Sequence, residues 1–280
     1  MEQPKSTIVS VSTAELYDRW AKFYDTDGNM LQAIDDTEVP PLIAMLFAHL
    51  TRDKPRGEPG TKRFKITELG CGTGRNTSKL LKGPFSVQIT AFHALDLSAE
   101  MLKLARQACL SPKTTHTTQG PAVATGPTLH FQQFDALDGT QSLPLGVRGS
   151  DAVLSTLVLE HLPLDRFFAT VAEMLGTGGW LLITNMHEEM GRKSQAGFVD
   201  VANGVKIRGQ SFVHGIEEVV EVAARLGFEL MGPVRERGVM PGDLHVIGAR
   251  GKKWVGCQVW FGAIFRYVGT VVPSSETSKT

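Results

Sequence analysis

The order of apolar and polar residues predicts strands that alternate with helices from residue 64 onward. Short apolar runs predict five strands, at residues 64–69, 87–97, 129–134, 152–157 and 180–184. Helical spacing of apolar residues lies between some of them, at residues 77–82, 99–109 and 164–175. In the second of these helices the predicted buried face is Met101, Leu104, Ala105 and Ala108. Such alternation is typical of a parallel sheet with right-handed crossovers, so the sequence predicts an α/β fold.

The first 62 residues have a different pattern, which predicts an N-terminal helical cap. Ser12 and Glu15 have the spacing of a capping box. The helix that follows should carry Leu16, Trp20 and Phe23 on one face. A second helix is predicted at residues 36–50, with its two prolines in the first turns, and a polar linker rich in Pro and Gly at 51–62. We therefore expect a cap and linker at 1–62 and the main domain at 63–280.

Two stretches interrupt the pattern of the main domain. Residues 111–127 are polar and are predicted to form a surface insertion. Residues 186–215 are predicted to cover the substrate and to contain a hairpin around Ala-Asn-Gly at 202–204. A helix at 216–226, a strand at 228–231 and a final strand within 254–267 follow. Two late strands after a helix predict an antiparallel addition at one edge of the sheet.

Composition narrows the class of partner. Lys plus Arg and Asp plus Glu both total 29, so no basic field argues for a nucleic-acid partner. The first twenty residues lack the apolar core of a signal peptide, and the C-terminal apolar tract is too polar to span a bilayer. The three cysteines show no CxxC spacing, and no helix carries paired metal ligands. We expect a soluble cytoplasmic protein without a metal, a membrane or an obligate protein partner.

The segment ITELGCGTGRNTSKLL, residues 66–81, is a candidate ligand-binding loop. Its string is E-x-G-x-G-x-G, with Glu68 at the end of a predicted strand. The dinucleotide fingerprint needs a third glycine where Arg75 stands, and a P-loop needs Gly-Lys-Ser/Thr. An acid at the strand end disfavours a nearby pyrophosphate and favours a ligand that carries positive charge.

Four motifs in this order resemble the class I S-adenosylmethionine-dependent methyltransferases. They are ELGCGTG at 68–74, LDLSAEML at 95–102, FDALD at 134–138 and SDAVLSTLVLEHL at 150–162. The resemblance implies a Rossmann-like, seven-stranded sheet and S-adenosyl-L-methionine as cofactor. It implies that the glycines lie under the amino-acid part of the cofactor, that Asp96 accepts from both ribose hydroxyls and that Asp135 contacts the adenine. The cofactor candidates are Tyr17, Trp20, Tyr24, Glu68, Gly70, Cys71, Gly72, Gly74, Asn76, Asp96, Leu97, Met101, Asp135, Ala136 and Thr156.

Two further segments, residues 15–36 and 252–262, are similar to small fungal methyltransferases of secondary-metabolite clusters. Among these are enzymes that methylate the free dithiol of gliotoxin-like epidithiodiketopiperazines, and relatives that methylate nitrogen. The resemblance implies S-methylation of a small, partly apolar metabolite. N- or O-methylation of a related metabolite, and a non-catalytic cofactor-binding regulator, remain alternatives.

Two histidines are candidate proton acceptors, because ligands of open α/β sheets bind beyond the carboxyl ends of the strands. His161 follows the predicted fourth strand and His187 the fifth; each is either catalytic or a residue of the loop. His93 lies inside a strand and is predicted to be a buried structural residue. Tyr17, Trp20 and Tyr24 would attract a sulfonium by cation–π contact, or pack in a core. The predicted substrate wall is Met186, Met190 and Phe198.

Overall fold

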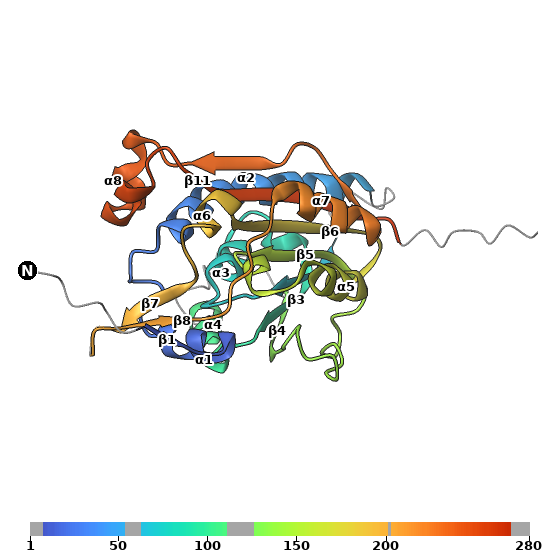
Figure 1. The fold of residues 1–280 in the computed structure, drawn as a ribbon. Helices are drawn as coiled ribbons and strands as arrows, with labels where there is room; N and C mark the ends of the chain where they lie inside the picture. The colour runs from blue at the N-terminus through green and yellow to red at the C-terminus, as the bar shows by residue number, and fades with distance from the viewer. Residues whose placement is uncertain (1–7, 54–62, 111–125, 201–202, 270–280) are drawn as a thin grey trace, which may run out of the picture.

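A mixed β-sheet between two layers of helices forms the body of the protein (Figure 1). The computed structural model describes residues 8–53, 63–110, 126–200 and 203–269. The main sheet contains β2 (Phe64–Leu69), β3 (Ile89–Asp96), β4 (Thr128–Gln133), β5 (Ser150–Thr156), β6 (Leu175–Met186), β9 (Phe228–Leu230), β10 (Arg235–Gly238) and β11 (Gln258–Tyr267). Seven strands follow the order β10-β11-β6-β5-β2-β3-β4, and β9 pairs with the same strand, β11, as β10 does.

The pairing confirms the predicted α/β fold and the antiparallel addition. Strands β4, β3, β2, β5 and β6 run parallel, whereas β11 pairs antiparallel with β6. Strand β10 was not predicted. On the side of β11 that faces away from β6, β10 and β9 pair with different parts of β11, so two short strands occupy the position of one long strand.

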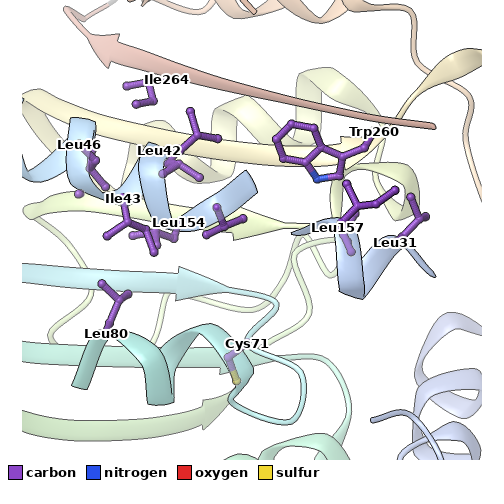
Figure 2. Packing of buried hydrophobic residues seen from close by; sticks show 14 of the residues in the cluster. Leu31, Leu42, Ile43, Leu46, Cys71, Leu80, Leu154, Leu157, Trp260 and Ile264 are labelled. Carbon is purple, nitrogen blue, oxygen red and sulfur yellow. The ribbon is translucent and has the colours of Figure 1, made fainter. Parts of the chain in front are cut away.

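The sheet is apolar on both faces because alternate residues of each strand point to opposite helical layers. Trp180 and Leu182 of β6 face the layer of α2 (Met30–Asp53), α3 (Arg75–Lys82) and α4 (Ala99–Leu110). Leu181 and Ile183 face α5 (Leu164–Met174) and α7 (Ile216–Arg225). Figure 2 shows side chains of α2, among them Leu42 and Ile43, packed toward the strands of the first face.

Helix α2 begins at Met30, six residues before the predicted start, so the prediction that Pro40 and Pro41 lie in its first turns is wrong. The two prolines are inside the helix. The carbonyls that lose their partners belong to Asp36 and Thr37, which are exposed, so water can satisfy them. Burial of Val39 and of the residues after the prolines in the main core stabilises the helix beyond this local break.

Two predicted apolar faces are corrected. The buried residues of α4 are Met101, Leu102, Ala105 and Cys109, whereas Ala108 is exposed and Leu104 only half-buried. The face turns in this direction because Ala105 packs against Gly74, where an added Cβ would lie 2.9 Å from the Ala105 Cα. Helix α1 (Thr13–Trp20) is capped by Ser12 as predicted, but it ends before Phe23, which is 42% exposed.

A second, three-stranded sheet joins the N-terminus to the predicted insertion. Strands β7 (Gly197–Asp200) and β8 (Val205–Arg208) form the expected hairpin, and β1 (Ile8–Ser10) adds in parallel to β8. Leu16 and Trp20 of α1 pack on Phe198 and Ile207 of this hairpin. These segments lie close together at one end of the molecule (Figure 1). Most of the predicted surface insertion falls in residues 111–125, outside the described residues. Most of the predicted linker, with its domain boundary at residue 62, falls in residues 54–62, which also lie outside them.

A buried carboxylate connects the two ends of the chain. Asp35 of α2 is fully buried and accepts from Arg75 at 2.7 Å, from the Thr184 hydroxyl at 2.7 Å and from the Trp260 indole at 3.0 Å. Arg75 stands where a dinucleotide fingerprint would have its third glycine. Its ion pair with Asp35 explains why this loop needs an arginine there.

Candidate active site

The first cavity is open to solvent, contains about 720 Å³ of free space with the solvent at its mouth included, and lies at the carboxyl ends of β2, β3, β4 and β5. Its lining residues are Thr13, Tyr17, Tyr24, Leu69, Gly70, Gly72, Asp96, Leu97, Phe134, Asp135, Ala136, Leu137, Thr156, Leu157, Val158, His161 and Leu162. Nine of the predicted cofactor residues are among them: Tyr17, Tyr24, Gly70, Gly72, Asp96, Leu97, Asp135, Ala136 and Thr156. Four different strand ends therefore bring these residues together, as the sequence motifs predict.

Asp96 presents a pre-oriented carboxylate to this cavity. Its Oδ2 accepts from the Gly72 N–H at 2.7 Å, and its Oδ1 accepts from the Ser98 N–H at 2.9 Å. Burial raises the pKa of Asp96 to about 6, although these two N–H donors act in the opposite direction. Each oxygen keeps a second lone pair, so the group is suited to accept from the two hydroxyls of a ribose.

The glycines of the loop have different roles. A Cβ on Gly70 would lie 2.2 Å from a methyl of Val158, so Gly70 allows close packing of protein on protein. Gly72 has φ +55°, and a Cβ there would meet no protein atom within 4 Å. Because Gly72 also lines the first cavity, its open side allows a ligand to approach the backbone. The open backbone lies next to the Asp96 carboxylate, which fits a ligand with a ribose such as S-adenosylmethionine.

Six predicted cofactor residues do not line the first cavity. They are Trp20, Glu68, Cys71, Gly74, Asn76 and Met101. Cys71 and Met101 are buried in the protein interior, and Gly74 packs on Ala105. Asn76 acts from behind the cavity wall, since its amide donates to the Thr156 hydroxyl at 2.9 Å.

The negative charge expected for Glu68 is a further point on which the structure differs from the sequence argument. The carboxyl is 1% exposed and accepts from the Thr77 hydroxyl. Burial raises the pKa of Glu68 to about 8, so at neutral pH the group is mostly protonated. It is therefore not the fixed negative charge from which the sequence argument inferred a positively charged ligand.

Several lining residues were missed by the sequence motifs. Phe134 and Leu137 lie on either side of Asp135 and Ala136 in FDALD, and Leu162 lies inside the fourth motif, so the signal for these was present. The resemblance already implied that residues 155–158 flank the cofactor, and Leu157 and Val158 of that range do line the cavity. Leu69 ends the first strand of the motif series. Thr13 had no local signal, because only tertiary folding brings the N-terminus to the cavity.

A second open cavity, with about 740 Å³ of free space including the solvent at its mouth, adjoins the first. Tyr17, Tyr24 and Leu157 line both cavities. The second is further lined by Trp20, Asp27, Asn29, Met30, Leu31, Glu160, Met186, Met190, Ser194, Gln195, Ala196, Gly197, Arg250, Lys253 and Trp254. The predicted substrate residues Met186 and Met190 are therefore in its wall. Phe198 is not; it stacks behind Trp20, with ring centroids 5.5 Å apart.

Leu157 holds an unusual backbone conformation between the two cavities. Its φ is +56°, which is uncommon for a residue with a branched side chain. Its N–H donates to the Thr184 carbonyl at 2.8 Å. Figure 2 shows Leu157 and Leu31 near the indole of Trp260. Strain of this kind clusters at ligand sites, where the surrounding structure maintains it.

His161 is held by two contacts at the wall of the first cavity. Its Nδ1 lies 3.1 Å from the Gln210 carbonyl oxygen, and its Nε2 lies 2.8 Å from the Tyr17 hydroxyl. A carbonyl oxygen can only accept, so Nδ1 carries a proton. In the neutral imidazole Nε2 then accepts from Tyr17. Burial raises the pKa of Tyr17 well above its ordinary value, which keeps the phenol a neutral donor.

His187 lies elsewhere, which corrects its predicted place in the crevice. It is the N-cap of α6 (Glu188–Gly191), where Nδ1 accepts from the Glu189 N–H at 3.0 Å. Its Nε2 lies 3.1 Å from a carboxylate oxygen of Glu236. His187 lines neither cavity, and both ring nitrogens have partners. His93, predicted to be structural, is 3% exposed and stacks on His130, and burial lowers its pKa to about 4.

Comparison with known proteins places the chain in a family. Residues 67–183 match the family model described as a methyltransferase domain. An uncharacterised methyltransferase of Emericella nidulans is 42% identical over 268 residues, 91% of this chain and 91% of the relative. The chain belongs to the class I S-adenosylmethionine-dependent methyltransferases, and S-adenosylmethionine is its cofactor.

Solved structures agree with the fold. The N-methyltransferase NodS of Bradyrhizobium japonicum, in complex with S-adenosylhomocysteine, aligns with a TM-score of 0.53 at 13% identity, over 92% of this chain and 99% of NodS. A methyltransferase of Mesorhizobium loti aligns with a TM-score of 0.51 at 19% identity, over 81% of this chain and 96% of that one. Within the described residues, no helix is both long and apolar enough to cross a bilayer. The same residues contain no group of three or more His, Cys, Asp or Glu side chains that could hold a metal ion.

Proposed function

We propose that the protein methylates sulfur in a small fungal secondary metabolite, namely the free dithiol of a gliotoxin-like epidithiodiketopiperazine. One observation carries this proposal: two cavities of similar volume share Tyr17, Tyr24 and Leu157 as a common wall. One cavity has the residues suited to the cofactor, and the other adjoins it across this shared wall. Methyl transfer is an in-line displacement, so two adjoining sites that align donor and acceptor are its main requirement.

Each side of the shared wall has a defined task. Bound S-adenosylmethionine supplies an electrophilic methyl group on a sulfonium. Asp96 orients the ribose, and Gly72 lets the backbone approach the ligand. Tyr17 and Tyr24 present neutral aromatic rings, which attract a sulfonium by cation–π interaction. On the acceptor side Met186 and Met190 give an adaptable, polarisable surface.

Sulfur is the proposed acceptor atom because a thiol reaches its reactive thiolate near neutral pH. An alcohol, with its higher pKa, would depend more strongly on a base. The resemblance of residues 15–36 and 252–262 to fungal dithiol-methylating enzymes supports the same choice. The apolar part of the wall, which includes Met186 and Met190, suits an uncharged ring system next to the reacting thiols.

The test is incubation with reduced gliotoxin and S-adenosylmethionine, followed by mass spectrometry. We expect a mass gain of one or two methyl groups on sulfur. Oxidised gliotoxin, whose disulfide offers no free thiol, is the matched control and should gain none. If only an amine or hydroxyl analogue of the metabolite is methylated, the acceptor atom is nitrogen or oxygen and not sulfur. Tight cofactor binding with no turnover of thiol, amine or hydroxyl would instead favour the non-catalytic regulator.

A further inference from the structure

We propose that the side chain of Glu160 is the general base that takes the proton from the methyl acceptor. This inference rests on the proposed methyl transfer and names a residue that the sequence motifs did not select. Glu160 is in the 3-10 helix Leu159–His161 (η3), directly after the strained Leu157. Two consecutive residues of this turn line different cavities: Glu160 the second and His161 the first.

The backbone of Glu160 is fixed while its carboxyl group is left free. Its N–H donates to the side-chain oxygen of Asn185 at 3.1 Å, and its carbonyl accepts from the Phe212 N–H at 2.6 Å. Within the described residues, no N–H or hydroxyl donates a hydrogen bond to the carboxyl oxygens. The ionisable group recorded beside them is His161, whose Nε2 lies 4.0 Å from the Glu160 Oε1. A carboxylate that is positioned but unpaired, and 5% exposed, retains lone pairs for a ligand proton.

The other candidate bases already have hydrogen-bond or ion-pair partners within the protein. His161 accepts from Tyr17, so taking a second proton would break that contact. Asp27, the other acid of the second cavity, accepts from the Trp20 indole at 2.9 Å and from the Asn29 N–H at 2.9 Å. It is also paired with Arg250 at 3.4 Å. Glu160 is therefore the carboxylate in this cavity that is available to the acceptor.

The surroundings of Glu160 raise its basicity. Burial raises the pKa of Glu160, and the neighbouring His161 lowers it to a smaller extent. The titratable and charged groups that face it are His161 on its own turn, Tyr17 and Tyr24 from α1 and the segment after it, and Asp27, Arg250 and Lys253 around the second cavity. Both tyrosines are neutral and Asp27 is paired with Arg250, so burial is the main influence on the pKa of Glu160. A more basic carboxylate removes a proton more readily.

The step balances in atoms and charge. The acceptor's X–H bond breaks as its electron pair forms the new bond to the methyl carbon. The C–S electron pair stays with the sulfonium sulfur, which becomes a neutral thioether, and the proton passes to a carboxyl oxygen of Glu160. One positive and one negative charge disappear together, which is favourable in a buried site. Release of the proton to water restores the carboxylate.

The experiment compares Glu160→Gln with the wild type in single-turnover methylation of reduced gliotoxin at saturating S-adenosylmethionine. For a general base we expect a loss of roughly 10²–10⁴-fold at low pH. The loss should disappear above the pKa of the thiol, about 8.5 for a free thiol. Glu236→Gln is the matched control, because Glu236 is exposed and lines neither cavity. It should keep the wild-type rate; a loss there alone would overturn the proposal and point to its partner His187.

Two further results would overturn the proposal. One is an active Glu160→Gln with the wild-type pH profile. The other is an equal loss at every pH, which would mean that Glu160 only positions its neighbours. Thermal melting and calorimetric cofactor binding establish that the variant is folded, and Glu160→Asp replaces it if it is not. The shorter carboxylate should retain part of the rate and the wild-type pH dependence.

A second measurement needs no turnover and separates this proposal from the proposed function. Infrared difference spectra of the ligand-free protein follow the C=O stretch of protonated carboxyl groups with pH. Subtracting Glu160→Gln from the wild type isolates Glu160. We expect a band that persists above the ordinary range of glutamic acid and then disappears as pH rises. If gliotoxin is not methylated but this band titrates, the substrate proposal fails and the base survives. Without such a band the raised basicity of Glu160 is excluded, and that part of the proposal fails.

Discussion

Asp96 is the residue through which pH should act on cofactor binding. Burial raises its pKa to about 6 in the ligand-free protein. Below that pH the carboxyl is protonated and loses both its charge and one acceptor site for the ribose hydroxyls. Affinity for S-adenosylmethionine should therefore decrease as pH decreases through about 6 and be nearly constant above it. Isothermal titration calorimetry over a series of pH values measures this.

The variant Asp96→Asn should remove most of that pH dependence. It should also weaken binding by about 1.5–3 kcal/mol, the range for a hydrogen bond to a charged group. Asp165→Asn is the matched control, since Asp165 is exposed and does not line the cavity. If wild-type affinity did not change on crossing the pKa, Asp96 would not be the ribose acceptor.

The sequence predicted single residues well where the strand ends alone determine their place. Asp96, Asp135 and Thr156 end or follow parallel strands, and such ends meet at one edge of the sheet. It failed for roles that depend on what packs around a side chain. The charge of Glu68 is set by its burial, and His187 is oriented by Glu236, which lies 49 residues further along the chain. Neither the burial of Glu68 nor the contact between His187 and Glu236 can be inferred from the local spacing of residues.

At the level of elements, helix α1 is held to the main domain by a polar contact that should control cofactor affinity. Asp18 Oδ1 accepts from the Ser98 hydroxyl at 2.6 Å and from the Glu100 N–H at 3.3 Å, at the start of α4. The same helix contributes Tyr17 to both cavities. Asp18→Ala should loosen this wall, and we expect about fivefold weaker binding of S-adenosylmethionine, near 1 kcal/mol.

A second signature distinguishes this docking role from a general loss of stability. The charge of Asp18 contributes to the raised pKa of Asp96, so its removal should lower the pH at which cofactor affinity decreases. Glu15→Gln, on the exposed side of the same helix, should bind the cofactor as the wild type does. Equal affinities for Asp18→Ala and wild type would show that α1 does not depend on this contact.

The elements that could be predicted are those long enough to show a repeating spacing of apolar residues. The five parallel strands, α5 and α7 fall near their expected positions because their apolar faces are long. Strand β1 has three residues, all exposed, and pairs with β8 almost two hundred residues later. Strand β10 reads Arg-Glu-Arg-Gly and has no apolar face, so only its pairing with β11 makes it a strand.

At the level of the whole molecule, contacts distant in sequence hold the two ends of the chain on one core. Asp35 near the N-terminus meets Trp260 near the C-terminus, and α2 packs on β11 and β6. The described part of the first 53 residues is therefore not only a cap: α2 belongs to the main core, whereas α1 and β1 belong to the hairpin. A sequence pattern assigns each element a face but does not state which distant element covers it.

The stability of the whole ligand-free protein should depend on pH through Glu68. Its pKa is raised from 4.5 to about 8 in the folded protein, because the carboxyl is buried under the glycine loop. The folded state thus holds a proton that the unfolded chain loses above about 4.5. The free energy of unfolding should decrease as pH rises from there to about 8, by a few kcal/mol in all, and then stay level.

Glu68→Gln places a neutral isostere that can still accept from Thr77, so this contribution should vanish. Asp96 and His93 titrate in both proteins, so the difference between the two stability curves isolates Glu68. Urea denaturation over a series of pH values gives both curves, and Glu229→Gln on the exposed side of β9 should reproduce the wild-type slope. A difference curve that is flat between the two pKa values would mean that the folded protein keeps Glu68 ionised, with a positive partner beside it.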